Sequence, residues 1–160
     1  MNLHKDFYKY KGIVIDTGPL LLVLTGLYGH NIKKFNYSED NFILVKKFLE
    51  NFLEKSEIFI TPEVLAEISN LSKNEMKGFF YDFIYYSKIR LLQRLKETYI
   101  NKDIILSEDK LLKYGFTDIS LIEATKDDKL LLTSDIALYG YCVKNKIPAI
   151  TIEELRVYMS

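Results

Sequence analysis

Four acidic residues stand at positions where carboxylates could act together on one substrate. Asp16 directly follows the apolar run Gly12–Ile15, and Asp135 follows a second apolar run, Lys129–Leu132, after two hydroxyl residues. Asp118 opens a helical pattern that leads into that second run. The carboxyl ends of parallel strands form the active-site edge of a sheet. We therefore expect these three acids to approach one sheet edge.

Glu67 is the fourth candidate acid. It borders the apolar face of a helical segment that opens at Thr61–Pro62. A glutamate at such a border commonly extends into solvent, but one that reaches over the sheet edge can join Asp16. Structural explanations also exist for the other acids, because Asp118 and Asp135 stand at helix starts, where aspartate is a common cap.

Capping is the weakest explanation for Asp16. Pro19 fits the first position of a helix, which would place the cap at Gly18. Thr117 can likewise cap in place of Asp118, whose helical spacing to apolar residues puts its carboxylate on the core-facing side. An acid on a buried side needs a cation or a metal as partner.

Four carboxylates at one edge repel one another, and a divalent cation is the usual way to relieve that repulsion. No Lys or Arg adjoins any of the four in sequence. Ligand sets made only of oxygen select Mg²⁺ or Mn²⁺. Two histidines and one cysteine leave little material for a zinc centre, a Ser-His-Asp triad or a disulfide framework.

Short apolar strands that alternate with helices must position these acids. The alternation predicts an α/β class, with a three-layer α/β/α sandwich on a mainly parallel sheet of about five strands. The expected strands are Gly12–Ile15, Ile58–Ile60, Asp103–Leu106, Lys129–Leu132 and Ala149–Thr151. The expected helices begin at Pro19, Ser38, Pro62, Asn74 (with a break near Gly78 or Ser87), Thr117, Asp135 and Ile152.

The composition is that of one globular domain spanning residues 1–160, with 48% apolar and 28% charged residues. The 22 basic and 22 acidic residues cancel, which excludes a polybasic nucleic-acid coat but allows a local basic patch. The longest apolar run, Pro19–Leu24, is far too short for a membrane span. Together with a single Cys142, this favours a cytoplasmic protein without membrane contact.

The acids and their neighbours resemble the motifs of PIN-domain nucleases, the family that includes the VapC-type toxins of toxin–antitoxin pairs. The resemblance extends over almost the whole chain, from Gly12 to about Ile152. It implies a PIN-like form of the three-layer fold that the strand pattern predicts. The matching segments are Val14–Leu20, Pro62–Ile68, Phe116–Asp118 with Ile122 and Ala124, and Leu131–Asp135.

The resemblance implies a metal-dependent endoribonuclease that hydrolyses RNA phosphodiester bonds with an activated water and uses Mg²⁺ or Mn²⁺. It gives Thr17 the position of the small polar residue after the first acid and Thr133 that of the small hydroxyl residue two places before the last acid, and both would support the site. The implied partners are RNA, a second copy in a homodimer and, for a toxin, an antitoxin protein. A role in RNA processing is the other possibility. The acidic quartet would be Asp16, Glu67, Asp118 and Asp135.

Two further features could serve RNA or a partner. Basic residues concentrate between positions 88 and 102, where phosphate contact is one interpretation and a solvated helical face the more common one. The aromatic cluster Phe79–Tyr86 is interpreted as core and helix packing, with a partner surface or base stacking as alternatives. The candidates for phosphate contact are Lys88, Arg90, Arg94 and Lys96.

Two other functions stay open at this point. A PIN-like fold without catalysis could act as an interaction module. A phosphatase on a similar sheet would need a second acid two residues after Asp16, and the chain has Gly18 there.

Overall fold

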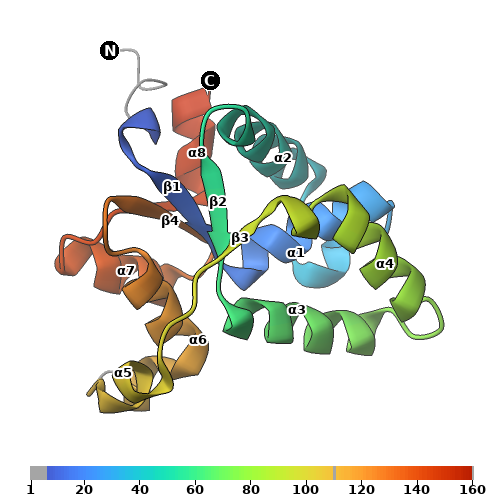
Figure 1. Ribbon diagram of the computed structural model, residues 1–160. Helices are drawn as coiled ribbons and strands as arrows, with labels where there is room; N and C mark the ends of the chain where they lie inside the picture. Colours follow the sequence, from blue (N-terminus) through green and yellow to red (C-terminus); the bar gives the residue numbers. More distant parts are fainter. Residues whose placement is uncertain (1–6, 110, 160) are drawn as a thin grey trace.

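The computed structural model describes residues 7–109 and 111–159 and is built on a five-stranded sheet (Figure 1). The strand order is β3-β2-β1-β4-β5, and every neighbouring pair is parallel. This architecture confirms the predicted α/β class and the parallel five-stranded sheet. The strands are β1 (Gly12–Ile15), β2 (Glu57–Ile60), β3 (Lys96–Glu97), β4 (Lys129–Thr133) and β5 (Ala149–Thr151).

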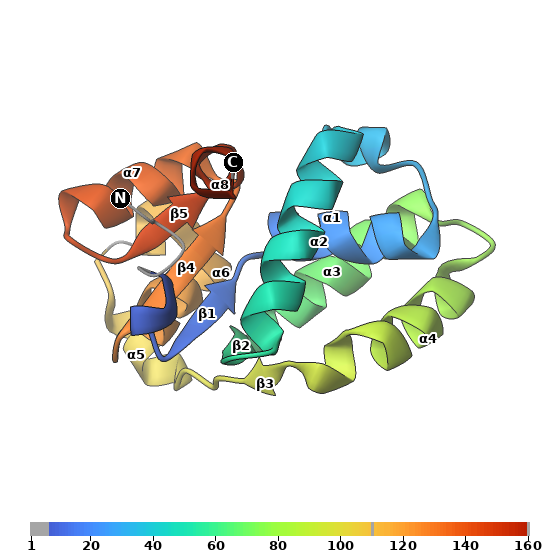
Figure 2. The ribbon, with the colours of Figure 1, turned by 90° about the horizontal axis from the view of Figure 1, so that it is seen from above.

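Helices cover both faces of the sheet (Figures 1 and 2). Contacts between elements group α1, α2 and α8 on one side and α6 and α7 on the other, which gives the three layers expected from the sequence. The helices are α1 (Thr17–Tyr28), α2 (Glu39–Leu53), α3 (Pro62–Glu75), α4 (Phe80–Arg90), α5 (Lys102–Ser107), α6 (Leu111–Ala124), α7 (Ile136–Lys144) and α8 (Ile152–Met159). The short 3₁₀ turns are η2 (Phe7–Lys9), η3 (Ile32–Phe35) and η4 (Leu92–Arg94).

The third strand is not where the sequence predicted it. The apolar run Asp103–Leu106 lies in helix α5, so its assignment as a strand was wrong. Asn101 starts this helix, because its side chain accepts a hydrogen bond from the Asp103 N–H at 2.8 Å. The actual third strand, β3, is two exposed residues long and pairs with the end of β2.

The start of α1 also differs from the prediction. The helix begins at Thr17, and Asp16 is its N-cap, with its carboxylate accepting a hydrogen bond from the Thr17 N–H. The expectation that Gly18 would cap the helix was therefore wrong. Pro19 is the third helical residue, which is acceptable because the first N–H groups of a helix have no intrahelical partner.

The central strand explains why the acids can be held so firmly. All four residues of β1 are buried, with β2 and β4 on its two sides and helices on both faces. The backbone at the carboxyl end of this strand is therefore fixed by the core. No helix among the described residues has the length and apolar character to cross a membrane.

Candidate active site

The four candidate acids come together at one pocket. Asp16 follows β1, Glu67 lies on α3, Asp118 lies on α6, and Asp135 starts α7 after β4. All four line a pocket of about 510 Å³ at the carboxyl edge of the sheet. In Figure 1 this edge points down, toward α3 and α6. The convergence that the sequence predicted is therefore present in the fold.

Asp16 is the most buried of the four, with 7% of its surface exposed. The Thr17 N–H donates to its Oδ1, and the Thr133 hydroxyl donates to its Oδ2, each at 2.6 Å. Burial raises the pKa of Asp16 to about 6, because it outweighs these two hydrogen bonds, and the charges of Glu67 and Asp135 raise the pKa further.

Two threonine hydroxyls hold Glu67 toward the pocket. Thr17 Oγ1 donates to Glu67 Oε2 at 2.7 Å, and Thr117 Oγ1 donates to Glu67 Oε1 at 2.5 Å. The Thr17 hydroxyl therefore contacts Glu67, whereas only its backbone N–H contacts Asp16. The sequence pattern predicted only a helix cap for Thr117. Because Thr117 directly precedes Asp118, its position also indicated that it lies at the site.

The carboxylate of Asp118 accepts no hydrogen bond from any residue that the structure describes, although this side chain is half-buried. Burial is the main cause that raises the pKa of Asp118 to about 7, followed by the negative charges of Asp16, Asp135 and Glu67. Each of the other three acids thus acts electrostatically on Asp118, so the four form one charged group.

Asp135 is an exposed helix cap as well as a pocket residue. Its Oδ1 accepts a hydrogen bond from the Leu138 N–H at 2.9 Å, which confirms the predicted cap of α7. Its own N–H donates to Thr133 Oγ1 at 2.9 Å. The Thr133 hydroxyl therefore connects Asp135 with Asp16.

The donor set of the pocket suits a hard divalent cation. None of the residues that line it is Lys, Arg or His, and no ion pair between described residues involves the four acids. The available ligands are carboxylate and hydroxyl oxygens, which Mg²⁺ and Mn²⁺ prefer. Within ranges 7–109 and 111–159, however, no three His, Cys, Asp or Glu side chains are already arranged to hold an ion. A cation held by three of these side chains would therefore require them to move closer together.

The fold does not bring the basic candidates to this pocket. Arg90 and Arg94 line a separate hollow between α1, α2 and α4. Lys96 forms an ion pair with Glu57, which begins β2 at the opposite edge of the sheet. Lys88 is exposed on α4. Any contact of these side chains with RNA therefore lies away from the acids.

Three of the six aromatic residues of the Phe79–Tyr86 cluster pack against α1. The Tyr28 ring stacks on Phe79 and meets Phe83 and Tyr86 edge-on, and the Tyr86 hydroxyl donates to the Leu27 carbonyl at 2.7 Å. These contacts confirm the interpretation as helix packing. Tyr81 and Tyr85 are the exposed tyrosines of the cluster.

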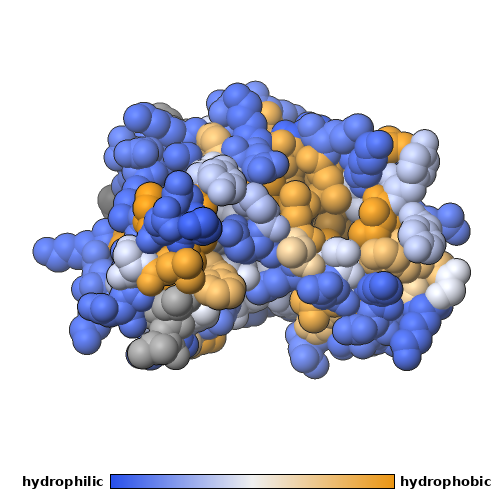
Figure 3. Space-filling model, turned by 60° about the horizontal axis from the view of Figure 1, so that its bottom comes forward, coloured by the Kyte–Doolittle hydropathy of each residue, from blue (hydrophilic) through white to orange (hydrophobic). Residues whose placement is uncertain are grey.

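The sequence missed several neutral residues at the pocket. The Tyr37 hydroxyl and Ser134 Oγ lie 2.6 Å apart, and burial raises the pKa of Tyr37. Exposed Leu71 and Phe116 also line the pocket. Figure 3 looks toward this end of the molecule and shows apolar side chains among hydrophilic ones. Phe116 and Ser134 lie in segments that resemble the family motifs, beside Asp118 and Asp135, whereas Tyr37 and Leu71 carried no such signal.

The fold and the site together define an α/β protein with an acidic pocket at the carboxyl edge of a parallel sheet. No protein-family model matches the chain, and no curated protein matches it. Its function is therefore inferred from the pocket itself.

Proposed function

We propose that the chain is a divalent-metal-dependent endoribonuclease of the PIN type. One observation carries the proposal: four carboxylates from four separate elements line one pocket that has no basic lining residue among those described. Proteins rarely gather such charges unless a cation compensates them. The order of the motifs along the chain, which resembles that of the PIN family, supports the nuclease activity over other metal-dependent reactions.

The acids have different places in this scheme. Asp16 is fixed by Thr133 and by the start of α1, so it suits a rigid ligand position. Asp118 accepts no hydrogen bond within the described chain, so its carboxylate oxygens are available to a cation or to a proton. Both carboxylate oxygens of Glu67 and one of Asp135 accept hydrogen bonds, and these two acids complete the charge of the site. A bound Mg²⁺ or Mn²⁺ would lower the pKa of water and neutralise the substrate phosphate.

Calorimetric titration with Mn²⁺ at low salt tests the metal site. Wild-type protein should bind the ion, and the Asp16→Asn/Asp118→Asn double variant should not. Glu154→Gln is the matched control, because Glu154 is a carboxylate near the end of β5 that neutral donors already satisfy. Equal binding by the wild type and the double variant would contradict the proposed site.

Cleavage of single-stranded RNA, with and without EDTA, then tests the activity. Metal-dependent cleavage that disappears in the double variant is the expected result. Wild-type protein that binds Mn²⁺ but hydrolyses a small aryl phosphate instead of RNA would be a phosphatase. A chain that binds no metal and cuts no RNA would fit an interaction module.

A further inference from the structure

Two hydroxyl groups from distant parts of the chain hold each other at the acidic pocket. Tyr37 lies between η3 and α2, Ser134 lies between β4 and α7, and their hydroxyl oxygens are 2.6 Å apart. Both residues line the pocket with the four acids. Ser134 directly precedes Asp135, so the pair is attached to the site by sequence as well as by packing.

Gly18 leaves the space that this pair occupies. A Cβ at position 18 would lie 2.5 Å from the Tyr37 hydroxyl oxygen and would also clash with Ser134 Oγ. Gly18 lies inside helix α1, where alanine is otherwise preferred to glycine. The need to accommodate the Tyr37–Ser134 pair therefore gives a physical reason for glycine here.

The pair also has a hydrogen to donate. The hydroxyls of Thr17 and Thr117, which line the same pocket, already donate to Glu67. Tyr37 and Ser134 have two hydroxyl hydrogens and share one hydrogen bond, so the hydrogen of the accepting group is left over. A lysine beside the acids would compete with a metal cation for them. A neutral hydroxyl can donate to a phosphoryl oxygen without such competition.

We propose that the Tyr37–Ser134 pair positions the RNA substrate by donating this hydrogen to a phosphoryl oxygen of the strand. The inference rests on the proposed ribonuclease function and adds the group that holds the substrate beside the acids. The contact is neutral, so it should leave the salt dependence of RNA binding unchanged, whereas the loss of a Lys or Arg contact would reduce it.

The test compares wild type with the Tyr37→Phe/Ser134→Ala double variant. Binding of a short labelled single-stranded RNA is measured in Ca²⁺ by fluorescence anisotropy over a range of salt, and cleavage is measured in Mn²⁺. We expect about tenfold weaker binding, a matching rise in KM, a smaller change in kcat and an unchanged salt slope. Tyr86→Phe/Ser56→Ala is the matched control, since it removes two hydroxyl hydrogen bonds outside the pocket.

Gly18→Ala tests the same pair without removing a hydroxyl. Its Cβ would meet only the ends of two side chains, which can move aside, so the variant should fold and lose RNA affinity as the double variant does. If wild type cleaves RNA and both variants bind it as tightly as wild type, the positioning role is overturned and the ribonuclease proposal stands. If wild type neither binds nor cleaves RNA, both are overturned.

Discussion

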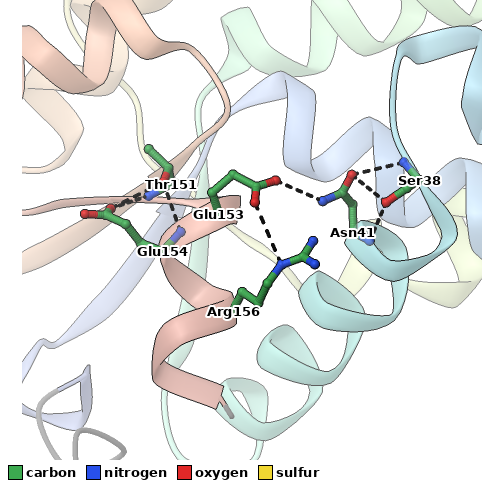
Figure 4. A network of polar contacts seen from close by, with 6 residues as sticks. All are labelled: Ser38, Asn41, Thr151, Glu153, Glu154 and Arg156. Carbon is green, nitrogen blue, oxygen red and sulfur yellow. Dashed lines mark hydrogen bonds and ion pairs between the residues drawn. The ribbon is translucent and has the colours of Figure 1, made fainter.

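Thr133 and Thr151 are register partners on neighbouring strands, and each contacts a carboxylate. The surroundings of these two carboxylates differ. Thr133 ends β4 and donates to Asp16, whereas Thr151, its register partner at the end of β5, contacts Glu154. Glu154 accepts hydrogen bonds from the Thr151 N–H at 2.9 Å and from the Tyr139 hydroxyl at 2.5 Å. Figure 4 shows Thr151 and Glu154 at the start of α8. Asp16 instead faces three more acids.

The comparison distinguishes a carboxylate with a structural role from one that is suited to act as a metal ligand. The Glu154 N–H donates back to Thr151 Oγ1, which completes a reciprocal cap of α8. Both oxygens of the Glu154 carboxylate accept hydrogen bonds from neutral donors. At the pocket, the four acids share few hydrogen-bond donors, and the carboxylate of Asp118 accepts no hydrogen bond from the described chain. Charge density, rather than the presence of hydrogen bonds, therefore distinguishes the two regions.

The largest expected effect is on catalysis. Asp16→Asn should lower kcat/KM for RNA cleavage by at least about a hundredfold, because losing a metal ligand costs more than losing a group that only supports one. Glu154→Gln should leave the rate near that of wild type. Steady-state cleavage assays in Mn²⁺ check both. Comparable losses in the two variants would erase the distinction between the regions.

The metal-free protein should lose stability as pH rises from about 4 to about 7. The folded-state pKa values of Asp16 (about 6) and Asp118 (about 7) lie above the ordinary 3.8. The folded protein thus binds these protons more tightly than the unfolded chain, and the unfolding free energy falls as they leave. At about 1.4 kcal/mol per pH unit, ionised Asp16 alone destabilises by about 3 kcal/mol.

Urea unfolding at several pH values in EDTA measures this decline. The Asp16→Asn/Asp118→Asn double variant should lose most of it, and Mn²⁺ should offset it in the wild type because the ion binds the folded state. Stability that rises steadily with pH from 4 to 7 in metal-free wild type would contradict the prediction.

Thr133→Val against Thr151→Val sharpens the comparison at matched positions. Valine keeps the shape and removes the hydroxyl. At position 133 this removes the donor to Asp16 Oδ2 and the acceptor of the Asp135 N–H, so Mn²⁺ affinity should fall by about 10–100-fold. At position 151 the affinity should stay the same while stability falls by about 1 kcal/mol. Calorimetry and thermal unfolding measure the two quantities, and the reverse pattern would refute the assignment.

The smallest effect is expected at the edge of the Glu154 region. Arg156 lies 3.8 Å from Glu153 in an exposed ion pair, which Figure 4 shows beside Asn41. Arg156→Ala should change the unfolding free energy by less than about 1 kcal/mol and leave Mn²⁺ binding unaltered. A larger loss would mean that this surface network supports the fold more than its exposure indicates.

Much of the fold was predictable because four strands carry apolar side chains bounded by helix caps. Ser38 and Asp135, for example, cap α2 and α7 as their sequence positions indicated. β3 was not predictable, because Lys96 and Glu97 are exposed and only the backbone of β2 specifies them as a strand. The apolar run at Asp103–Leu106 had the composition of a strand, but the Asn101 cap favours a helix.

The site residues that follow strands or lie on helices were predictable, whereas the residue that a loop contributes was not. The four acids were identified from their positions after strands or on helices, and their convergence follows from the parallel topology. Tyr37 reaches the pocket from a segment that carries no periodic pattern, so only the folded chain shows its partner Ser134. Asp16 is both a helix cap and a pocket acid. The sequence-based prediction considered capping and function as alternatives and therefore excluded this combination.

The order of the strands also sets when the pocket can exist during synthesis. The central strand is made first, yet Gly12 pairs with Lys129, and Asp16 meets Asp135 across 135 − 16 = 119 positions. At roughly 5–20 residues per second, that interval lasts about 6 to 24 s on the ribosome. Until β4 emerges, β1 lacks one neighbour and Asp16 stands without Asp135. A nascent chain therefore cannot assemble the four-acid pocket, and with it the proposed ribonuclease site, before Asp135 has left the ribosome.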